Sequence, residues 1–126
     1  MSKIVCQCNN IIIDQTDDLA YKAFFVRDQN FEKIQQRNSI IAQFIEAHKS
    51  GNKDKWLEKY FESDTYNNLE IESVINDILL RFDLEYQSTM YQCEKCGRLF
   101  VQKGNENNFL RFIPEEKDWK NIFKGL

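Results

Sequence analysis

Apolar residues recur at helical spacing through the middle of the chain. The clearest pattern covers residues 69–86, where apolar side chains share one face and acidic or amide side chains occupy the opposite face. Two further helices are predicted at 31–49, with Asn30 as the N-terminal cap, and at 54–62. The apolar stripe of the 69–86 helix consists of Ile71, Val74, Ile75, Ile78, Leu79, Phe82 and Tyr86.

Short apolar segments of the strand type lie at both ends of the chain. They are bounded by polar residues that favour turns, such as Asn9-Asn10 after the first segment. Pro114 ends the last segment, and a short helix is predicted near Trp119. The predicted strands cover residues 4–5, 11–13, 21–27, 91–92, 98–102 and 108–113.

Each end of the chain also carries a pair of cysteines within a turn. Cys93 and Cys96 belong to a Cys-x-x-Cys-Gly turn between strands, in which Gly97 can adopt a positive φ. Cys6 and Cys8 form a tighter Cys-x-Cys pair at the other end. Structural zinc takes four ligands, and the chain has four cysteines. We therefore expect all four, Cys6, Cys8, Cys93 and Cys96, to bind one structural Zn²⁺.

The placement of these elements predicts the fold class. We expect an α+β protein in which both chain ends, residues 1–29 and 87–114, form a small antiparallel zinc-ribbon sheet. A helical insertion of about three helices, residues 30–86, lies between the two cysteine pairs, and a tail follows at 115–126. A length of 126 residues corresponds to a single domain, 1–126.

Other uses of the cysteines are possible. A redox Cys-x-x-Cys usually opens a helix, whereas Cys96 precedes a predicted strand. Disulfides or buried thiols would leave the pairs without metal, and iron suits four thiolates as well as zinc does. Four thiolates leave no open coordination position, so the zinc reading predicts a stabilising site and no metal catalysis.

The charge of the chain is concentrated in one segment. Residues 58–85 carry eight acidic against two basic residues, whereas the whole chain has a net charge of −3. An acidic surface suits a basic protein partner and makes nucleic acid an unlikely one. We expect protein contacts at Asp64, Glu70, Glu72 and Asp77.

No catalytic pattern accompanies the cysteines, so we expect no enzyme. The single histidine, His48, falls near the end of a predicted helix, and Asp14, Asp17 and Asp18 suit a polar turn better than a Mg²⁺ site. The chain has no apolar run of about 18 residues and no signal peptide at its start. We therefore expect a cytoplasmic protein with reduced thiols and no membrane association.

The residues around the cysteines resemble those of a family of small bacterial zinc-ribbon-like proteins. The resemblance rests on residues 4–14, 16–19, 21–23, 28–30 and 91–99, with Asn9 and Ala20 as departures from the expected Gly and Pro. Some members of that family resemble immunity proteins of contact-dependent growth inhibition or polymorphic toxin systems. The resemblance implies a protein that binds and neutralises a cognate toxin domain.

Two functions follow as expectations. The first is a non-enzymatic immunity protein whose acidic segment covers the basic surface of a toxin, for example a nuclease. The alternative is a zinc-ribbon module that binds nucleic acid or a transcription or translation component. Four basic residues near the second cysteine pair could serve that alternative: Lys95, Arg98, Lys103 and Arg111.

Overall fold

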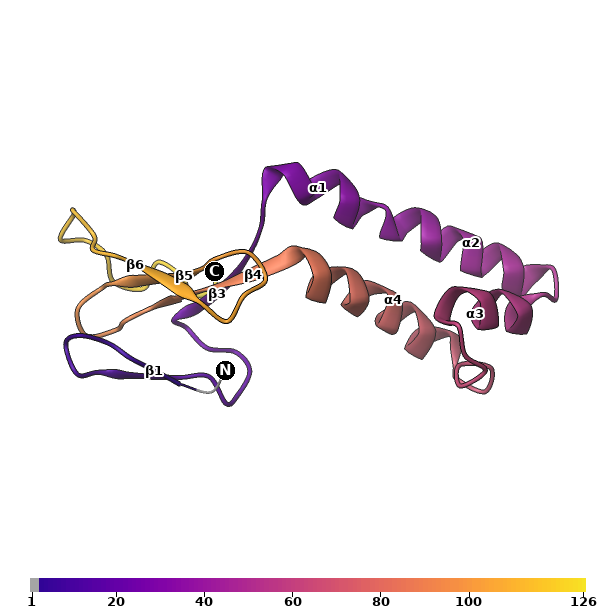
Figure 1. Ribbon diagram of the computed structural model, residues 1–126, viewed down its shortest axis with the longest axis horizontal. Coiled ribbons are helices and arrows are strands. Elements are labelled where there is room, and N and C mark those ends of the chain that lie inside the picture. Colours follow the sequence, from indigo (N-terminus) through magenta and orange to yellow (C-terminus); the bar gives the residue numbers. More distant parts are fainter. Residues whose placement is uncertain (1–2) are drawn as a thin grey trace. The chain divides into compact units, whose positions relative to one another are not determined.

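The computed structural model describes residues 3–126, which divide into two compact units (Figure 1). The terminal unit comprises the residues up to Phe25 together with Ser88–Leu126, and the helical unit comprises Val26–Gln87. The expectation of a single domain stays a prediction.

The terminal unit contains two antiparallel arrangements of strands. Strands β1 (Lys3–Val5) and β2 (Ile11–Ile13) pair with each other, with Ile4 opposite Ile12. The second sheet has the order β3-β4-β5-β6, and β5 pairs antiparallel with both neighbours. These four strands are β3 (Lys22–Val26), β4 (Gln87–Gln92), β5 (Leu99–Gln102) and β6 (Phe109–Phe112).

Strand alternation selects which apolar residues enter the core of the terminal unit. Successive side chains of a strand point to opposite faces, so Ile12 is buried while Ile11 and Ile13 are exposed. The buried cluster contains two of the cysteines and is completed by side chains from β2, β4 and β5. Its members are Cys6, Ile12, Tyr91, Cys93 and Phe100.

Asp14 holds the segment after β2 against β4. Its carboxylate accepts a hydrogen bond from the buried Tyr91 hydroxyl and lies 2.7 Å from the Lys22 ammonium group. Burial would raise the pKa of Asp14, but the hydrogen bonds from Lys22 and Tyr91 outweigh it and lower that pKa below its ordinary value. Burial and the nearby carboxylate raise the pKa of Tyr91. The Tyr91 phenol is therefore neutral, and its hydrogen bond to Asp14 links β4 to the segment after β2.

The helical unit contains four helices around its own apolar core. They are α1 (Asp28–Gln35), α2 (Arg37–Lys49), α3 (Lys53–Phe61) and α4 (Ile71–Tyr86). Phe44, Leu57, Val74 and Ile78 are fully buried, so the predicted stripe of α4 does face the core. None of the helices in the described part of the chain is long and apolar enough to cross a membrane.

The helix boundaries differ from the predicted ones. The expected 31–49 helix begins earlier, at Asp28, and is divided at Gln36, so Asn30 lies in the first turn of α1 instead of capping it. The end of α2 follows the expectation. Gly51 has φ +79°, its N–H bonds to the His48 carbonyl, and the Asn52 N–H bonds to the Ala47 carbonyl. This is a Schellman cap, which a left-handed glycine permits.

The fold class is therefore α+β. Antiparallel sheets come from the two chain ends, the helices lie between them in sequence, and the cysteine pairs of both ends meet. The predicted tail helix is wrong, since residues near Trp119 form turns and Asn121 has a positive φ of 60°.

Candidate metal centre

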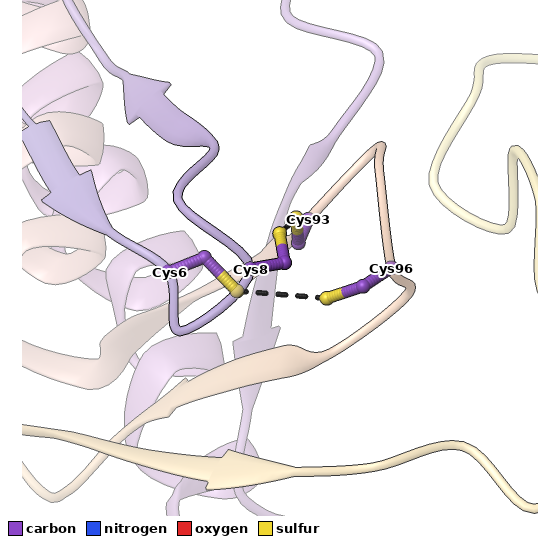
Figure 2. A group of neighbouring side chains, drawn as sticks. All are labelled: Cys6, Cys8, Cys93 and Cys96. Atoms are coloured by element: carbon purple, nitrogen blue, oxygen red, sulfur yellow. Dashed lines mark hydrogen bonds between the residues drawn. The ribbon is translucent and has the colours of Figure 1, made fainter.

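The four cysteines form one cluster in the terminal unit. Their sulfur atoms all lie within 4.8 Å of one another. Figure 2 shows Cys6 and Cys8 on one turn facing Cys93 and Cys96 on the other. The Cys6 and Cys96 sulfurs are 3.5 Å apart, as are those of Cys8 and Cys93. These separations exceed the roughly 2 Å of a disulfide bond, and all four cysteines are free thiols.

The second turn, residues 93–98, has the hydrogen bonds of a metal knuckle. The Cys93 N–H bonds to the Arg98 carbonyl and the Gly97 N–H bonds to the Cys93 carbonyl, both at 2.9 Å. Gly97 has φ +82°, as the sequence predicted for this position. The backbone N–H groups of Lys95 and Cys96 point at the Cys93 sulfur, and that of Arg98 points at the Cys96 sulfur. We call this turn the second knuckle.

The first turn, residues 6–10, repeats this pattern with one residue fewer. The Cys6 N–H bonds to the Asn10 carbonyl and the Asn9 N–H bonds to the Cys6 carbonyl, again at 2.9 Å. Asn9 takes the place of the glycine, with φ +72°. The backbone N–H of Asn10 bonds to the Cys8 sulfur. Asparagine tolerates this left-handed conformation better than most residues, so Cys-x-Cys forms a first knuckle despite its tight spacing.

The protein environment lowers the pKa of two of the thiols. Burial would raise the pKa of Cys93, but hydrogen bonds from the Cys96 and Lys95 amides and from the Asn10 side chain lower it to about 6. Burial would also raise the pKa of Cys96, but hydrogen bonds from N–H groups of Arg98 outweigh it and lower that pKa. At Cys8 the Asn10 amide acts in the same direction, but burial and the neighbouring thiols raise the pKa to about 11. Donors thus converge on sulfurs that a metal requires as thiolates.

The tail packs on the second knuckle at Gly97. A Cβ atom added to this glycine would lie 2.4 Å from Cδ2 of the Trp119 indole. The buried Gln92 side chain donates a hydrogen bond of 2.9 Å to the Trp119 carbonyl and a longer one of 3.5 Å to the Gly97 carbonyl. Gly97 is therefore required both for the left-handed turn and for the close approach of the indole.

The acidic residues expected to contact a partner lie in the helical unit. Asp64 lies in the segment between α3 and α4, and Glu70 and Glu72 lie at the start of α4. These three side chains are exposed, and none takes part in an ion pair of residues 3–126. Asp77 differs, because it is half-buried and bonded to the Tyr66 hydroxyl.

The basic residues near the second knuckle do not form one exposed group. The Arg98 guanidinium donates to the Cys96 sulfur at 3.2 Å, and Lys95 donates to the Cys8 carbonyl. Arg111 lies over the Phe100 ring, and Lys103 is exposed in the turn after β5. His48 is exposed in the last turn of α2, as expected for a helix end.

The sequence interpretation missed three residues of this site. Asn10 donates to the Cys93 sulfur of the other knuckle, Arg98 donates to the Cys96 sulfur of its own knuckle, and Trp119 covers Gly97. A partial signal existed for the first two, since each follows the left-handed residue of its knuckle. Nothing in the sequence indicated that Trp119 docks on a glycine 22 positions earlier.

The cysteine cluster is consistent with a metal site. Among residues 3–126, no other group of three or more Cys, His, Asp or Glu side chains is placed to hold an ion. Asp14, Asp17 and Asp18 thus form no such group.

Comparison with known proteins gives a family and no closer relative. No curated protein and no solved structure matches the chain. Residues 2–116 match one protein family, and this range includes both knuckles and the helical unit between them. The chain belongs to the family described as "Domain of unknown function (DUF8617)".

Proposed function

We propose that the four cysteines bind one structural zinc ion. The observation that carries this proposal is the convergence of four sulfurs from both chain ends within 4.8 Å. A tetrahedron with Zn–S bonds of about 2.3 Å places its sulfurs roughly 3.8 Å apart, close to the 3.5 Å between opposite cysteines. Four protein ligands leave no position for a reacting water, so the ion holds the fold together.

We further propose that the protein is a non-enzymatic binding protein, specifically an immunity protein that neutralises a cognate bacterial toxin domain. The support is the resemblance of the knuckle segments to such proteins together with the exposed acids Asp64, Glu70 and Glu72. Exposed charges at the rim of an interface accelerate association with a partner of opposite charge. The partner surface is therefore basic, as in a nuclease that binds phosphates.

Metal content tests the first proposal. Purified full-length protein should contain one zinc per chain by mass spectrometry, and Co²⁺ substitution should give the absorption of a tetrahedral tetrathiolate site. Iron in the protein as purified would change the identity of the ion. A protein that binds neither Zn²⁺ nor Co²⁺ with its four thiols would overturn the proposal.

Partner capture and charge reversal test the second proposal. The tagged protein should retain a toxin domain from its native lysate in a stoichiometric complex that survives moderate salt. Changing Asp64, Glu70 and Glu72 together to Lys should weaken that complex at least tenfold, with zinc content unchanged. A matched control changes three exposed acids of the terminal unit: Glu106, Glu115 and Glu116.

Two results would contradict the immunity proposal. Equal affinity of the two triple variants would exclude the acidic surface as the contact. Recovery of nucleic acid, or of ribosomal or polymerase subunits, in place of a toxin would favour the zinc-ribbon alternative, whose affinity should fall steeply with salt.

A further inference from the structure

Asn10 and Arg98 occupy equivalent positions in the two knuckles. Each is the second residue after the second cysteine of its knuckle and directly follows the left-handed residue, Asn9 or Gly97. The backbone N–H of each bonds to the nearer cysteine sulfur, Asn10 to Cys8 and Arg98 to Cys96. The backbones of the two knuckles therefore place the Asn10 and Arg98 side chains in equivalent positions beside the sulfur cluster.

The Asn10 side chain crosses to the opposite knuckle, and the Arg98 side chain donates to a sulfur that faces the first knuckle. The Asn10 amide nitrogen Nδ2 lies 3.4 Å from the Cys93 sulfur, 83 positions away in sequence. The Arg98 guanidinium donates to the Cys96 sulfur at 3.2 Å, and the Cys6 sulfur lies 3.5 Å from that sulfur. Asn10 thus bridges Cys8 and Cys93, and Arg98 bonds to Cys96, which faces Cys6. These are the two sulfur pairs that lie 3.5 Å apart.

The two donors differ in charge. Four thiolates and one divalent ion carry a net charge of −2, and the Arg98 guanidinium offsets one unit of it, whereas the Asn10 amide is neutral. Hydrogen bonds from a charged donor to an anion are about twice as strong as neutral ones. Arg98 is also half-buried, so solvent screens its interaction with the sulfurs only partly. Lys95, also in the second knuckle, donates to the Cys8 backbone carbonyl.

We propose that Asn10 and Arg98 are positioning residues for the sulfurs of the metal site, that Asn10 joins the two knuckles, and that Arg98 slows metal loss from the Cys6–Cys96 side. This inference rests on the proposed zinc site. Partners that orient metal ligands usually change metal affinity by 10–100-fold when they are removed. The same donors withdraw electron density from the sulfurs, so they also affect the spectrum of a bound ion.

The test compares Arg98→Met with the wild-type chain and with Lys103→Met, which removes the same charge from an exposed turn. Zinc affinity and zinc release are measured by competition with a chelator. The cobalt–thiolate charge-transfer bands are recorded on each protein loaded with Co²⁺. We expect Arg98→Met to bind zinc 10–100-fold more weakly, to release it faster, and to shift the bands to lower energy. Lys103→Met should match the wild type.

Arg98→Lys and Asn10→Ala complete the design in case Arg98→Met folds poorly. Arg98→Lys keeps the charge but not the planar guanidinium that reaches the Cys96 sulfur, so its affinity should fall between those of the wild type and Arg98→Met. Asn10→Ala should also shift the charge-transfer bands, but it should lose less zinc affinity than Arg98→Met. Bands and release rates identical in Arg98→Met, Lys103→Met and the wild type would overturn the inference. A wild-type chain that binds no metal would instead overturn the zinc proposal itself.

Discussion

Replacing Gly97 with Ala tests whether the tail is part of the metal-binding unit. The new Cβ would lie 2.4 Å from Cδ2 and 2.7 Å from Cε2 of the Trp119 indole, whereas carbon atoms in contact are about 3.5–4.0 Å apart. The neighbouring backbone belongs to the second knuckle and cannot shift without moving Cys96. We therefore expect the indole to leave its position and the tail to detach from Gly97.

The cost in folding free energy has three contributions: backbone strain, lost indole contacts and one lost hydrogen bond. An alanine at φ +82° costs roughly 1–2 kcal/mol of backbone strain. Loss of the partly buried indole contacts adds roughly 1–3 kcal/mol, less than for a fully buried tryptophan. Loss of the hydrogen bond from Gln92 to the Trp119 carbonyl adds about 1 kcal/mol. The free energy of unfolding should thus fall by roughly 3–6 kcal/mol in total.

A double-mutant cycle with Trp119→Ala isolates the contact. Chemical denaturation at a fixed excess of zinc, followed by circular dichroism, gives the unfolding free energy of each variant. In the Trp119→Ala background, Gly97→Ala should cost only the backbone part, about 1–2 kcal/mol. Gly51→Ala and Gly104→Ala are matched controls, because both glycines have positive φ and no atom within 4 Å of the added Cβ. If the losses of unfolding free energy from Gly97→Ala and Trp119→Ala were strictly additive, the packing of the tail on the second knuckle would be refuted.

Three further perturbations test other parts of the structure. Cys93→Ser should abolish zinc binding and unfold the terminal unit, because structural zinc sites contribute folding energy of the order of a whole domain. Metal analysis and circular dichroism measure both effects. A variant that stays folded without zinc would contradict this prediction. Asp14→Asn should cost about 1–3 kcal/mol at pH 7 by removing the acceptor of Lys22 and Tyr91. Since the folded-state pKa of Asp14 is lowered from 3.8, that stability is present above the unfolded pKa and is lost as pH falls below 3.8. The unfolding free energies of wild type and Asp14→Asn, measured by denaturation, should therefore converge in acid. A constant difference down to pH 2 would exclude the carboxylate as the cause. Phe44→Ala should cost about 3–5 kcal/mol without changing zinc content, and reduced zinc in the folded variant would show coupling between the units.

The parts of the fold that local patterns control were predictable from sequence. Cysteine spacing with Gly97 or Asn9 identified both knuckles, because the turn needs a residue that accepts positive φ directly after the second cysteine. The stripe of α4 identified its buried face, since helical periodicity depends on residues within a few turns. The Schellman cap at Gly51 has the same local origin.

Features that depend on tertiary contacts were not predictable. Gln36 divides α1 from α2 with ordinary helical angles and no Pro or Gly to mark the break. The cross-knuckle hydrogen bond of Asn10 joins residues 83 positions apart, and no short window contains both partners. Trp119 was expected on a helix, but its indole contacts Gly97 and the tail forms turns.

The distribution of the sulfurs along the chain has a consequence for biosynthesis. The cysteines that face each other are 85 and 90 positions apart, so the first knuckle leaves the ribosome long before the second is made. At roughly 5–20 residues per second, that delay is about 4–18 s. During it, Cys6 and Cys8 are an incomplete chelate exposed to oxidants and competing metals, while the helical unit can already bury Phe44 and Leu57. With the proposed zinc site, metal acquisition would therefore be a late step, and the availability of zinc at that moment would decide whether the two cysteine pairs join.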